Sequence, residues 1–206
     1  MNYTVDSTQP HPQIKGIYRL RKDGAEIGWI GENAKIGENA WIGKDAWIGE
    51  DAIIGLGAVI GKNAVIGKGA MIGDGATIGP YAVIGWGTQI GKCAWINNGT
   101  WINEEAMIGD DAMIYEAAVI GACARIGAGA VIKYPYDYLT VGAIGSRQDV
   151  TTFYRHQDGM IHVWCGCFNG TLDDFETKVH KTHAGTIHER AYMAAIRMAK
   201  EIMIRG

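Results

Sequence analysis

The 206-residue sequence lacks any long run of apolar residues, and its first residues contain neither a basic start nor an apolar stretch. The first absence excludes a membrane-spanning helix, and the second argues against a secretory signal peptide. Charge of one sign is also scarce: the formal net charge of −3 gives no general attraction to nucleic acid or to an anionic membrane. Four cysteines without a secretory signal are typical of reduced thiols. We therefore expect a cytoplasmic protein whose partners include neither a nucleic-acid polymer nor a membrane.

Glycine, in contrast, is abundant and periodic, and it belongs to a six-residue repeat. Isoleucine recurs at every sixth residue from Ile30 to Ile132, eighteen times without interruption, and alanine follows four residues later with only two replacements by threonine. A period of six would scatter the isoleucines around an α-helix, but it suits short strands joined by tight turns. In Ala46-Trp47-Ile48, strand alternation places alanine and isoleucine on one side and tryptophan on the other. Gly-Lys-Asn or Gly-Asp-Gly then supplies the bend, because glycine and asparagine tolerate positive φ.

This pattern, from Ile27 to Lys133, resembles the hexapeptide-repeat family. The resemblance implies a mainly β fold, a left-handed parallel β-helix with three hexapeptides in each triangular coil. About six coils at about 4.8 Å each would make a prism on the order of 29 Å long. The predicted domains are an N-terminal arm and cap (1–26), the β-helix (27–133), a linker (134–149) and a C-terminal module (150–206).

The residue before each isoleucine points outward and returns to the same face of the prism every eighteen residues. Two of the three faces are almost wholly apolar, whereas the third begins with Lys35 and ends with Arg125. Outward tryptophans on two faces form a patch too large for a soluble monomer. Hexapeptide-repeat proteins are typically homotrimers with parallel prism axes, so we expect a homotrimer. The outward tryptophans of the two apolar faces are Trp29, Trp41, Trp47, Trp95 and Trp101.

The distribution of histidine argues against the commonest activity of the family. The acyltransferases of the family resemble one another in using a histidine base at the subunit interface and, usually, a loop that interrupts the repeat. The γ-class carbonic anhydrases, which share the fold, hold a metal with three histidines on the coils. Here no histidine occurs between His11 and His156, and no loop interrupts the isoleucine register. We therefore predict a non-catalytic scaffold without a cofactor. The alternatives are a divergent hexapeptide acyltransferase and a purely structural or assembly protein.

The composition changes after Lys133, and five of the six histidines and two of the four cysteines lie beyond it. "VTTFYR" and "MIHVWCG" predict two strands joined by the turn signal "HQDG", while Thr171 and Thr186 begin capping patterns for two helices. The result is a ββαα module of about 60 residues, too small to be very stable alone. The string "GSRQDVTTFYR" with "GCFNGTLDDFETKV" resembles a C-terminal module of bacterial and phage proteins; this resemblance supplies no catalytic residues. A phage protein of this kind would act in the host cytoplasm.

Three hypotheses compete for the chemistry of the module. The first is a metal site, because Cys165 and Cys167 would point to the same side of a strand, with His180 and His183 as further ligands. However, C-x-C is not the C-x-x-C zinc knuckle, and the sequence assigns no metal. The second is thiol catalysis, with Cys165 or Cys167 as nucleophile and His183 as base, although nothing in the sequence indicates a lowered thiol pKa.

The third hypothesis, which we favour, is capture of a small anionic ligand, for example a nucleotide-like signal. Residues 146–155 place two guanidinium groups close to hydroxyls and an aromatic ring, a combination that suits an anion with a flat ring. The helix start at Thr171 adds free backbone N–H groups. The alternative for each arginine alone is a surface ion pair with a nearby aspartate, Asp149, Asp158 or Asp173. The predicted ligand-binding residues are Ser146, Arg147, Thr152, Tyr154, Arg155, Trp164, Thr171 and His183.

Overall fold

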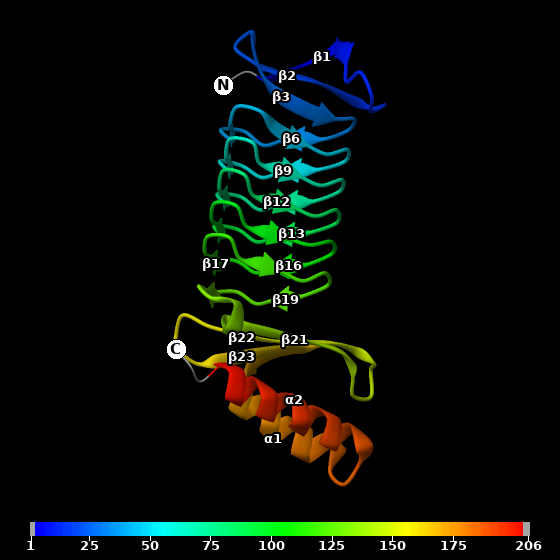
Figure 1. Cartoon of the computed structure of the whole chain (residues 1–206), viewed down its shortest axis with the longest axis vertical. Coiled ribbons are helices and arrows are strands. Elements are labelled where there is room, and N and C mark those ends of the chain that lie inside the picture. The colour runs from blue at the N-terminus through cyan, green and yellow to red at the C-terminus, as the bar shows by residue number, and fades with distance from the viewer. Residues whose placement is uncertain (1–2, 204–206) are drawn as a thin grey trace.

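The computed structural model describes residues 3–203 and shows three parts stacked along one long axis (Figure 1). Three N-terminal strands lie at one end, a column of coils forms the middle, and a module with both helices closes the other end. Within the described residues, no helix is both long and apolar enough to cross a membrane.

The N-terminal part is an antiparallel sheet that caps the first coil. It consists of β1 (Tyr3–Pro10), β2 (Ile17–Lys22) and β3 (Ala25–Gly31), and β3 continues into the column by pairing in parallel with β6 (Ala46–Ile48). Leu20 is fully buried over the open end of the coils. The cap thus extends the first sheet of the column, so that β6 does not present a bare edge.

The same arm covers two of the outward tryptophans. The ring of His11 packs edge-on against Trp29 and Trp47, at centroid distances of 4.6 and 5.3 Å, and the Arg19 guanidinium lies 3.7 Å from the ring centre of Trp29. Because these rings are half-buried within their own chain, the exposed tryptophan patch expected from the sequence is smaller than predicted. The outward tryptophans that remain exposed include Trp41, Trp95 and Trp101.

The column is built from three parallel sheets, in which each residue pairs with residues eighteen positions away, as Ile78 does with Ile60 and Ile96. The first sheet continues from β3 and β6 into β9 (Val65–Ile66), β12 (Val83–Ile84), β15 (Trp101–Ile102) and β18 (Val119–Ile120). The second contains β4 (Lys35–Ile36), β7 (Ile53–Ile54), β10 (Met71–Ile72), β13 (Gln89–Ile90), β16 (Met107–Ile108) and β19 (Arg125–Ile126). The third contains β5 (Trp41–Ile42), β8 (Val59–Ile60), β11 (Thr77–Ile78), β14 (Trp95–Ile96), β17 (Met113–Ile114) and β20 (Val131–Ile132).

The interior of the column follows the repeat. Isoleucine and alanine ladders fill it, and the two threonines that replace alanine are buried with their hydroxyls donating to carbonyls of the next coil: Thr88 to Asn103 at 3.0 Å and Thr100 to Tyr115 at 3.1 Å. Glycine follows isoleucine because coils stack closely; a Cβ on Gly67 would lie 2.6 Å from backbone atoms of the next coil. The predicted solenoid of about six coils is confirmed.

The C-terminal module contains two more strands than the sequence predicted. Its antiparallel sheet has the order β21-β22-β23-β24, and β21 lies inside residues 134–149, which were predicted as linker. Local composition did not reveal β21 because the strand forms by pairing with β22, for example Leu139 with Phe153. Both predicted helix caps are present: the hydroxyls of Thr171 and Thr186 accept the N–H groups of residues 174 and 189. The elements are η1 (Pro135–Asp137), β21 (Tyr138–Ile144), β22 (Asp149–Arg155), β23 (Ile161–Cys165), β24 (Phe168–Thr171), α1 (Leu172–His183) and α2 (Ile187–Met203).

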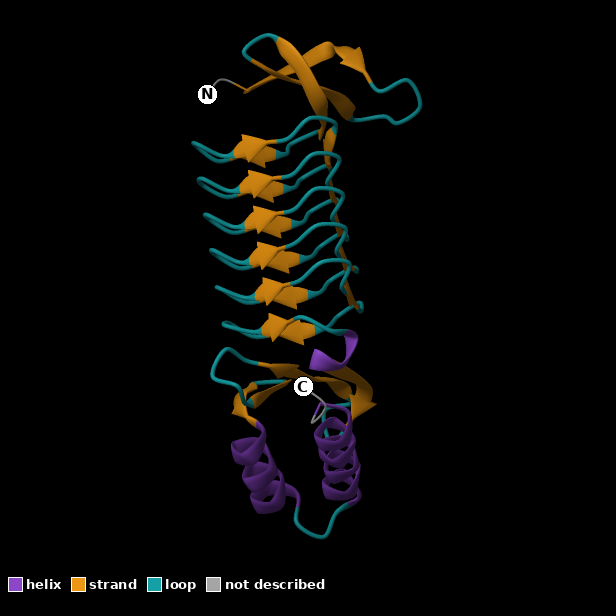
Figure 2. Ribbon diagram, turned by 60° about the vertical axis from the view of Figure 1, so that its left-hand side comes forward, coloured by secondary structure: helices purple, strands orange, loops and turns teal. Residues whose placement is uncertain are grey.

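The module sheet lies between the last coil and the two helices (Figure 2). Alternation along β22 therefore divides its side chains, so that Phe153 packs among the helices while Tyr154 packs against the isoleucine core of the column. The Tyr154 hydroxyl is 2.8 Å from Asn169 Oδ1, and burial is the main cause that raises the pKa of Tyr154 to about 12. On the same side, Thr152 Oγ1 accepts the backbone N–H of Arg125 at 3.1 Å.

Candidate functional site

A cavity of about 200 Å³ lies on the helix side of the module sheet. We call it the module cavity. Its walls come from the β21–β22 turn, the β23–β24 turn and both helices, and its floor is formed by the apolar side chains of Phe168, Phe175 and Val179. The polar side chains that line it include Ser146, Arg147, Cys165, Cys167, Lys178 and His183.

Two glycines with positive φ allow the turns to approach each other. Gly145 has a φ of 73°, and a Cβ there would overlap the ring of Tyr192. Gly166 has a φ of 58°, and a Cβ there would lie 2.8 Å from a guanidinium nitrogen of Arg147. The guanidinium of Arg147 thus rests over the glycine that separates the two cysteines, a position that any larger residue would obstruct.

Two cationic side chains line the module cavity. Arg147 and Lys178 both line it, and no aspartate or glutamate is among its lining residues within the part of the chain that the structure describes. The alternative for Arg147, an ion pair with a nearby aspartate, is not formed within residues 3–203, and Asp149 lies 3.4 Å from Arg125. The ammonium group of Lys178 lies 5.4 Å from the ring centre of Phe168, which is a cation–π contact rather than an ion pair.

A chain of three hydroxyl and thiol groups forms one wall. Thr151 donates to the sulfur of Cys165 at 3.3 Å, and the Cys165 thiol donates to the Tyr192 hydroxyl at 3.7 Å. Burial, followed by the contact with Cys165, raises the pKa of Tyr192 to about 12, so the phenol stays protonated at neutral pH. The ring of His183 lies 5.6 Å from that of Tyr192. Hydroxyl, imidazole and guanidinium groups therefore border one small volume.

The structure brings together only three of the eight predicted ligand-binding residues, namely Ser146, Arg147 and His183. Thr152 and Tyr154 point into the junction with the column, because they alternate with the residues of β22 that face the helices. Arg147 precedes β22 and Arg155 ends it, which separates the two arginines by on the order of 25 Å along an extended strand. The predicted pocket that uses both arginines is therefore not formed within one chain.

The remaining two predicted residues also lie elsewhere. Trp164 packs against the column and its indole N–H donates to the Gly166 carbonyl at 3.2 Å; it borders a different cavity of about 260 Å³ beside Met107. Thr171 caps α1, and its hydroxyl also lies 2.8 Å from a carboxylate oxygen of Asp174. The Asp174 carboxylate therefore occupies the helix start at which an anion was predicted to bind.

Three of the four predicted metal candidates, Cys165, Cys167 and His183, line the module cavity, but among residues 3–203 they do not have metal-ligand spacing. Cys165 ends β23, whereas Cys167 is exposed in the turn that follows, so the two do not share a strand face as expected. His180 lies 2.7 Å from the Glu189 carboxylate. Among residues 3–203, the one group of three side chains with metal-ligand spacing is His156 and Asp158 in the β22–β23 turn and His162 in β23. This H-x-D-x₃-H spacing is visible in the sequence, but its first four residues, "HQDG", were interpreted only as a turn signal.

Other residues of the module cavity were missed. Lys178 and Thr182 are four residues apart on α1 and therefore share a helix face with Phe175 and Val179, a spacing visible in the sequence. Tyr192 reaches the cavity only because α2 packs beside α1, and no local pattern indicated that contact.

Two family models match the coils. A model described as the GMPPB C-terminal domain matches residues 26–105, and one described as bacterial transferase hexapeptide (six repeats) matches residues 99–133. These matches confirm the predicted resemblance of the coils to the hexapeptide-repeat family. Neither model extends into the C-terminal module, and no curated protein matches the chain in sequence.

Solved structures with a similar fold are distant. Perosamine N-acetyltransferase from Caulobacter crescentus, solved with CoA and GDP-perosamine, is 19% identical over 52% of this chain and 54% of its own, with a TM-score of 0.39. The chain thus spans about half the length of that protein. UDP-N-acetylglucosamine acyltransferase from Francisella novicida is 19% identical over 85% of this chain and 79% of its own, with a TM-score of 0.30. Likenesses this loose carry no argument about activity.

Proposed function

We propose that this protein is a non-catalytic β-helical scaffold whose C-terminal module captures a small anionic ligand in the module cavity. The proposal rests on two cationic side chains, Arg147 and Lys178, that line one cavity. None of the described residues that line this cavity is an aspartate or a glutamate. Unpaired like charges in a partly enclosed site repel each other, and a bound anion relieves that repulsion. Guanidinium and ammonium groups are also the usual ligands of carboxylates and phosphates.

The volume of the module cavity restricts the ligand. Cavities that enclose drug-sized ligands measure about 300–1,000 Å³, whereas this cavity measures about 200 Å³. It suits a small acid, or the phosphate group of a nucleotide-like signal whose base lies outside. Tyr154 is buried against the column, so it cannot stack on that base in the arrangement described.

Thiol catalysis has weaker support than ligand capture. Cys165 and His183 border the same cavity, but over the described residues the hydrogen bonds of Cys165 go to Thr151 and Tyr192 and none joins a cysteine to His183. A nucleophile activated by a base needs that contact. Cys165 therefore serves as part of the wall.

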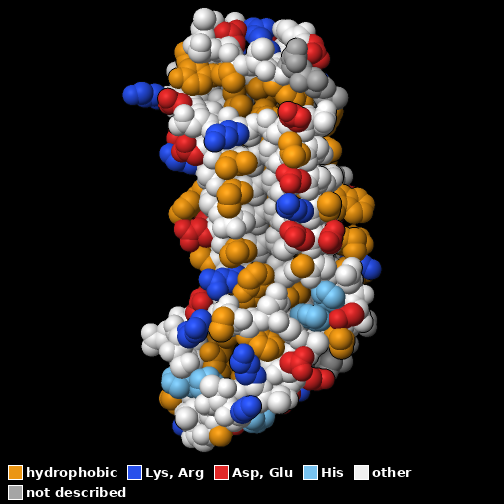
Figure 3. All heavy atoms as spheres, turned by 180° about the vertical axis from the view of Figure 1, so that it is seen from behind, with side chains coloured by type: hydrophobic (Ala, Val, Ile, Leu, Met, Phe, Trp, Pro, Cys, Tyr) orange, Lys and Arg blue, Asp and Glu red, His pale blue; other side chains and the backbone are white. Residues whose placement is uncertain are grey.

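We further propose that the protein acts as a cytoplasmic homotrimer that presents three such cavities. Support comes from an aromatic edge, where the third sheet meets the first, formed by Tyr81, Trp95 and Trp101. These side chains are 59, 49 and 56% exposed, and all three come from neighbouring coils. Hydrophobic side chains also follow the column in the view from behind, among acidic and basic ones (Figure 3). An apolar edge between two faces fits a threefold axis made with two further copies of the chain.

A thermal-shift screen of inorganic phosphate, small carboxylates and nucleotides tests ligand capture. A ligand at a hundred times its dissociation constant stabilises the folded chain by roughly 2.7 kcal/mol. We expect Arg147→Gln and Lys178→Gln each to reduce the shift strongly, whereas Arg155→Gln, which removes an equal charge at the other end of β22, should preserve it. If no anion shifts the melting temperature, or if the shift survives both cavity variants, ligand capture here is wrong and the structural alternative is favoured.

A further inference from the structure

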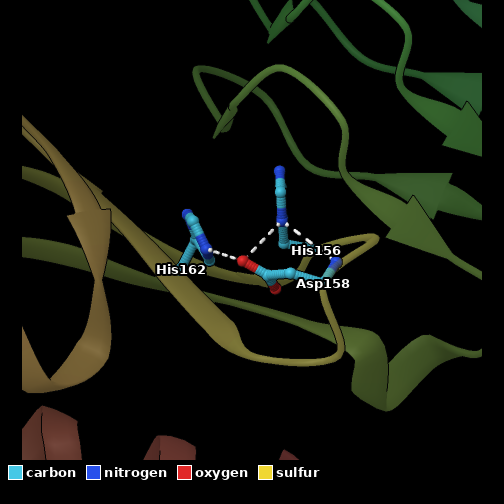
Figure 4. Close-up of side chains that lie close together, drawn as sticks. All are labelled: His156, Asp158 and His162. Atoms are coloured by element: carbon cyan, nitrogen blue, oxygen red, sulfur yellow. Dashed lines mark hydrogen bonds and ion pairs between the residues drawn. The ribbon is translucent and has the colours of Figure 1, made fainter.

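A second cluster of polar side chains lies outside the module cavity, at the turn between β22 and β23 (Figure 4). His156 Nδ1 lies 3.0 Å and His162 Nε2 2.9 Å from the same carboxylate oxygen, Oδ2 of Asp158. The two imidazole rings are stacked, with centroids 4.1 Å apart and an interplanar angle of 23°. Two basic rings and one carboxylate thus meet around a single point.

The spacing of these donor atoms fits a metal ion. All three lie within 4.8 Å of one another. Nitrogen and oxygen ligands at about 2.0–2.2 Å from a tetrahedral zinc ion lie about 3.3–3.5 Å apart, so the two nitrogen–oxygen distances need to lengthen by only a few tenths of an ångström. We propose that His156, Asp158 and His162 bind one divalent transition-metal ion of the Zn²⁺ type, with the remaining coordination position taken by water or a ligand.

The turn that carries the triad is held in place before any ion binds. The N–H of Gln157 donates to the Gly129 carbonyl in the last coil at 2.9 Å, and the N–H of His156 donates to the Met160 carbonyl at 3.1 Å. The first bond fixes the turn against the column and the second closes the turn itself, as a rigid metal site requires.

The carboxylate is oriented by a hydrogen bond of its own. The Met160 N–H donates to Asp158 Oδ1 at 2.8 Å, which leaves Oδ2 facing both rings. Oδ2 and the two facing ring nitrogens are thus the donor atoms that a cation would meet at this turn.

The triad also borders a second cavity, of about 520 Å³, where the module meets the column. His156 lines that cavity together with Lys133 and Arg155. A metal ion held by the ring of His156 would therefore lie at its edge, within reach of a molecule that entered from solvent.

Zinc titration of the full chain, freed of metal by a chelator, tests the proposal by calorimetry. We expect one Zn²⁺ per chain, and an affinity at least about 100-fold lower in His162→Gln and in Asp158→Asn, because even the loss of an outer-shell partner of a metal site costs about 10- to 100-fold. Two controls should keep the affinity of the parent: His180→Gln, which removes a histidine beside another carboxylate, and the double change Cys165→Ser with Cys167→Ser.

Cobalt spectroscopy of the unmodified protein gives a readout that does not depend on the folding of a variant. Nitrogen and oxygen ligands should produce the visible bands of Co²⁺ without the near-ultraviolet charge-transfer band of a thiolate. The proposal is wrong if no stoichiometric binding occurs, if the thiolate band appears, or if affinity is lost with the cysteines or His180 rather than with the triad.

Discussion

The aromatic edge gives the sharpest test of assembly, through the double variant Trp95→Lys with Trp101→Lys. Each ring is about half exposed in one chain. If an interface covers the exposed half of a side chain of about 250 Å², burial at about 25 cal/mol per Å² stabilises the trimer by about 3 kcal/mol per ring. The six rings of a trimer then contribute about 18 kcal/mol, which is comparable to the cost of the two associations that join three chains, at about 4–15 kcal/mol each.

Lysine removes this contribution and adds like charges around the axis, so the double variant should be a monomer. Sedimentation velocity of parent and variant measures the result directly. Trp86→Lys is the matched control: this ring is 54% exposed but lies in the turn between β12 and β13, at a different edge of the prism, and its variant should remain a trimer. A parent chain that sediments as a single monomeric species would refute the assembly, and a trimeric double variant would refute the choice of edge.

Three further outcomes are expected. Acetyl-CoA should neither bind in the micromolar range by calorimetry nor be consumed, because no loop interrupts the isoleucine register and no histidine occurs between His11 and His156 to serve as the base of an acyltransferase; micromolar binding that is lost when coils are deleted would favour the enzyme alternative. Gly145→Ala should destabilise the chain by about 2 kcal/mol or more in urea melts, because φ is 73° and the methyl group would meet Tyr192; an unchanged midpoint would contradict this. The lowered pKa of Asp158 stabilises the fold above the ordinary carboxyl pKa near 3.8, and this contribution is lost as pH falls toward about 2. Urea melts at pH 5 and pH 2.5 measure how much Asp158→Asn destabilises the chain relative to the parent. This destabilisation should be smaller at pH 2.5, and an equal loss of stability at both pH values would contradict the linkage.

The column could be predicted almost completely from the sequence, because its structure is local and repeated. Each isoleucine pairs with another isoleucine eighteen residues away, so a single six-residue pattern determines strand, turn and partner at once. Asn63 has a φ of 57° and Gly75 a φ of 66°, as predicted from the glycine and asparagine residues of the turns.

The module was harder to predict because its decisive contacts join segments that carry no shared pattern. Strand alternation placed Thr152 and Tyr154 on one face and Phe153 on the other, but only the structure shows that the column covers the first face and the helices the second. The site residues were therefore grouped by nearness in sequence, and Arg147 was joined with Arg155 although they stand at opposite ends of β22.

The eighteen-residue register of the column also defines how its length can change. Removing or adding one full coil would bring every outward side chain back to its own sheet and would move the cap and the module along the axis by about 4.8 Å relative to each other. Removing a single hexapeptide would instead carry each following strand onto the neighbouring sheet, turning the module by one face of the prism. Evolution can thus lengthen this protein in steps without disturbing either end, but only in units of a whole coil.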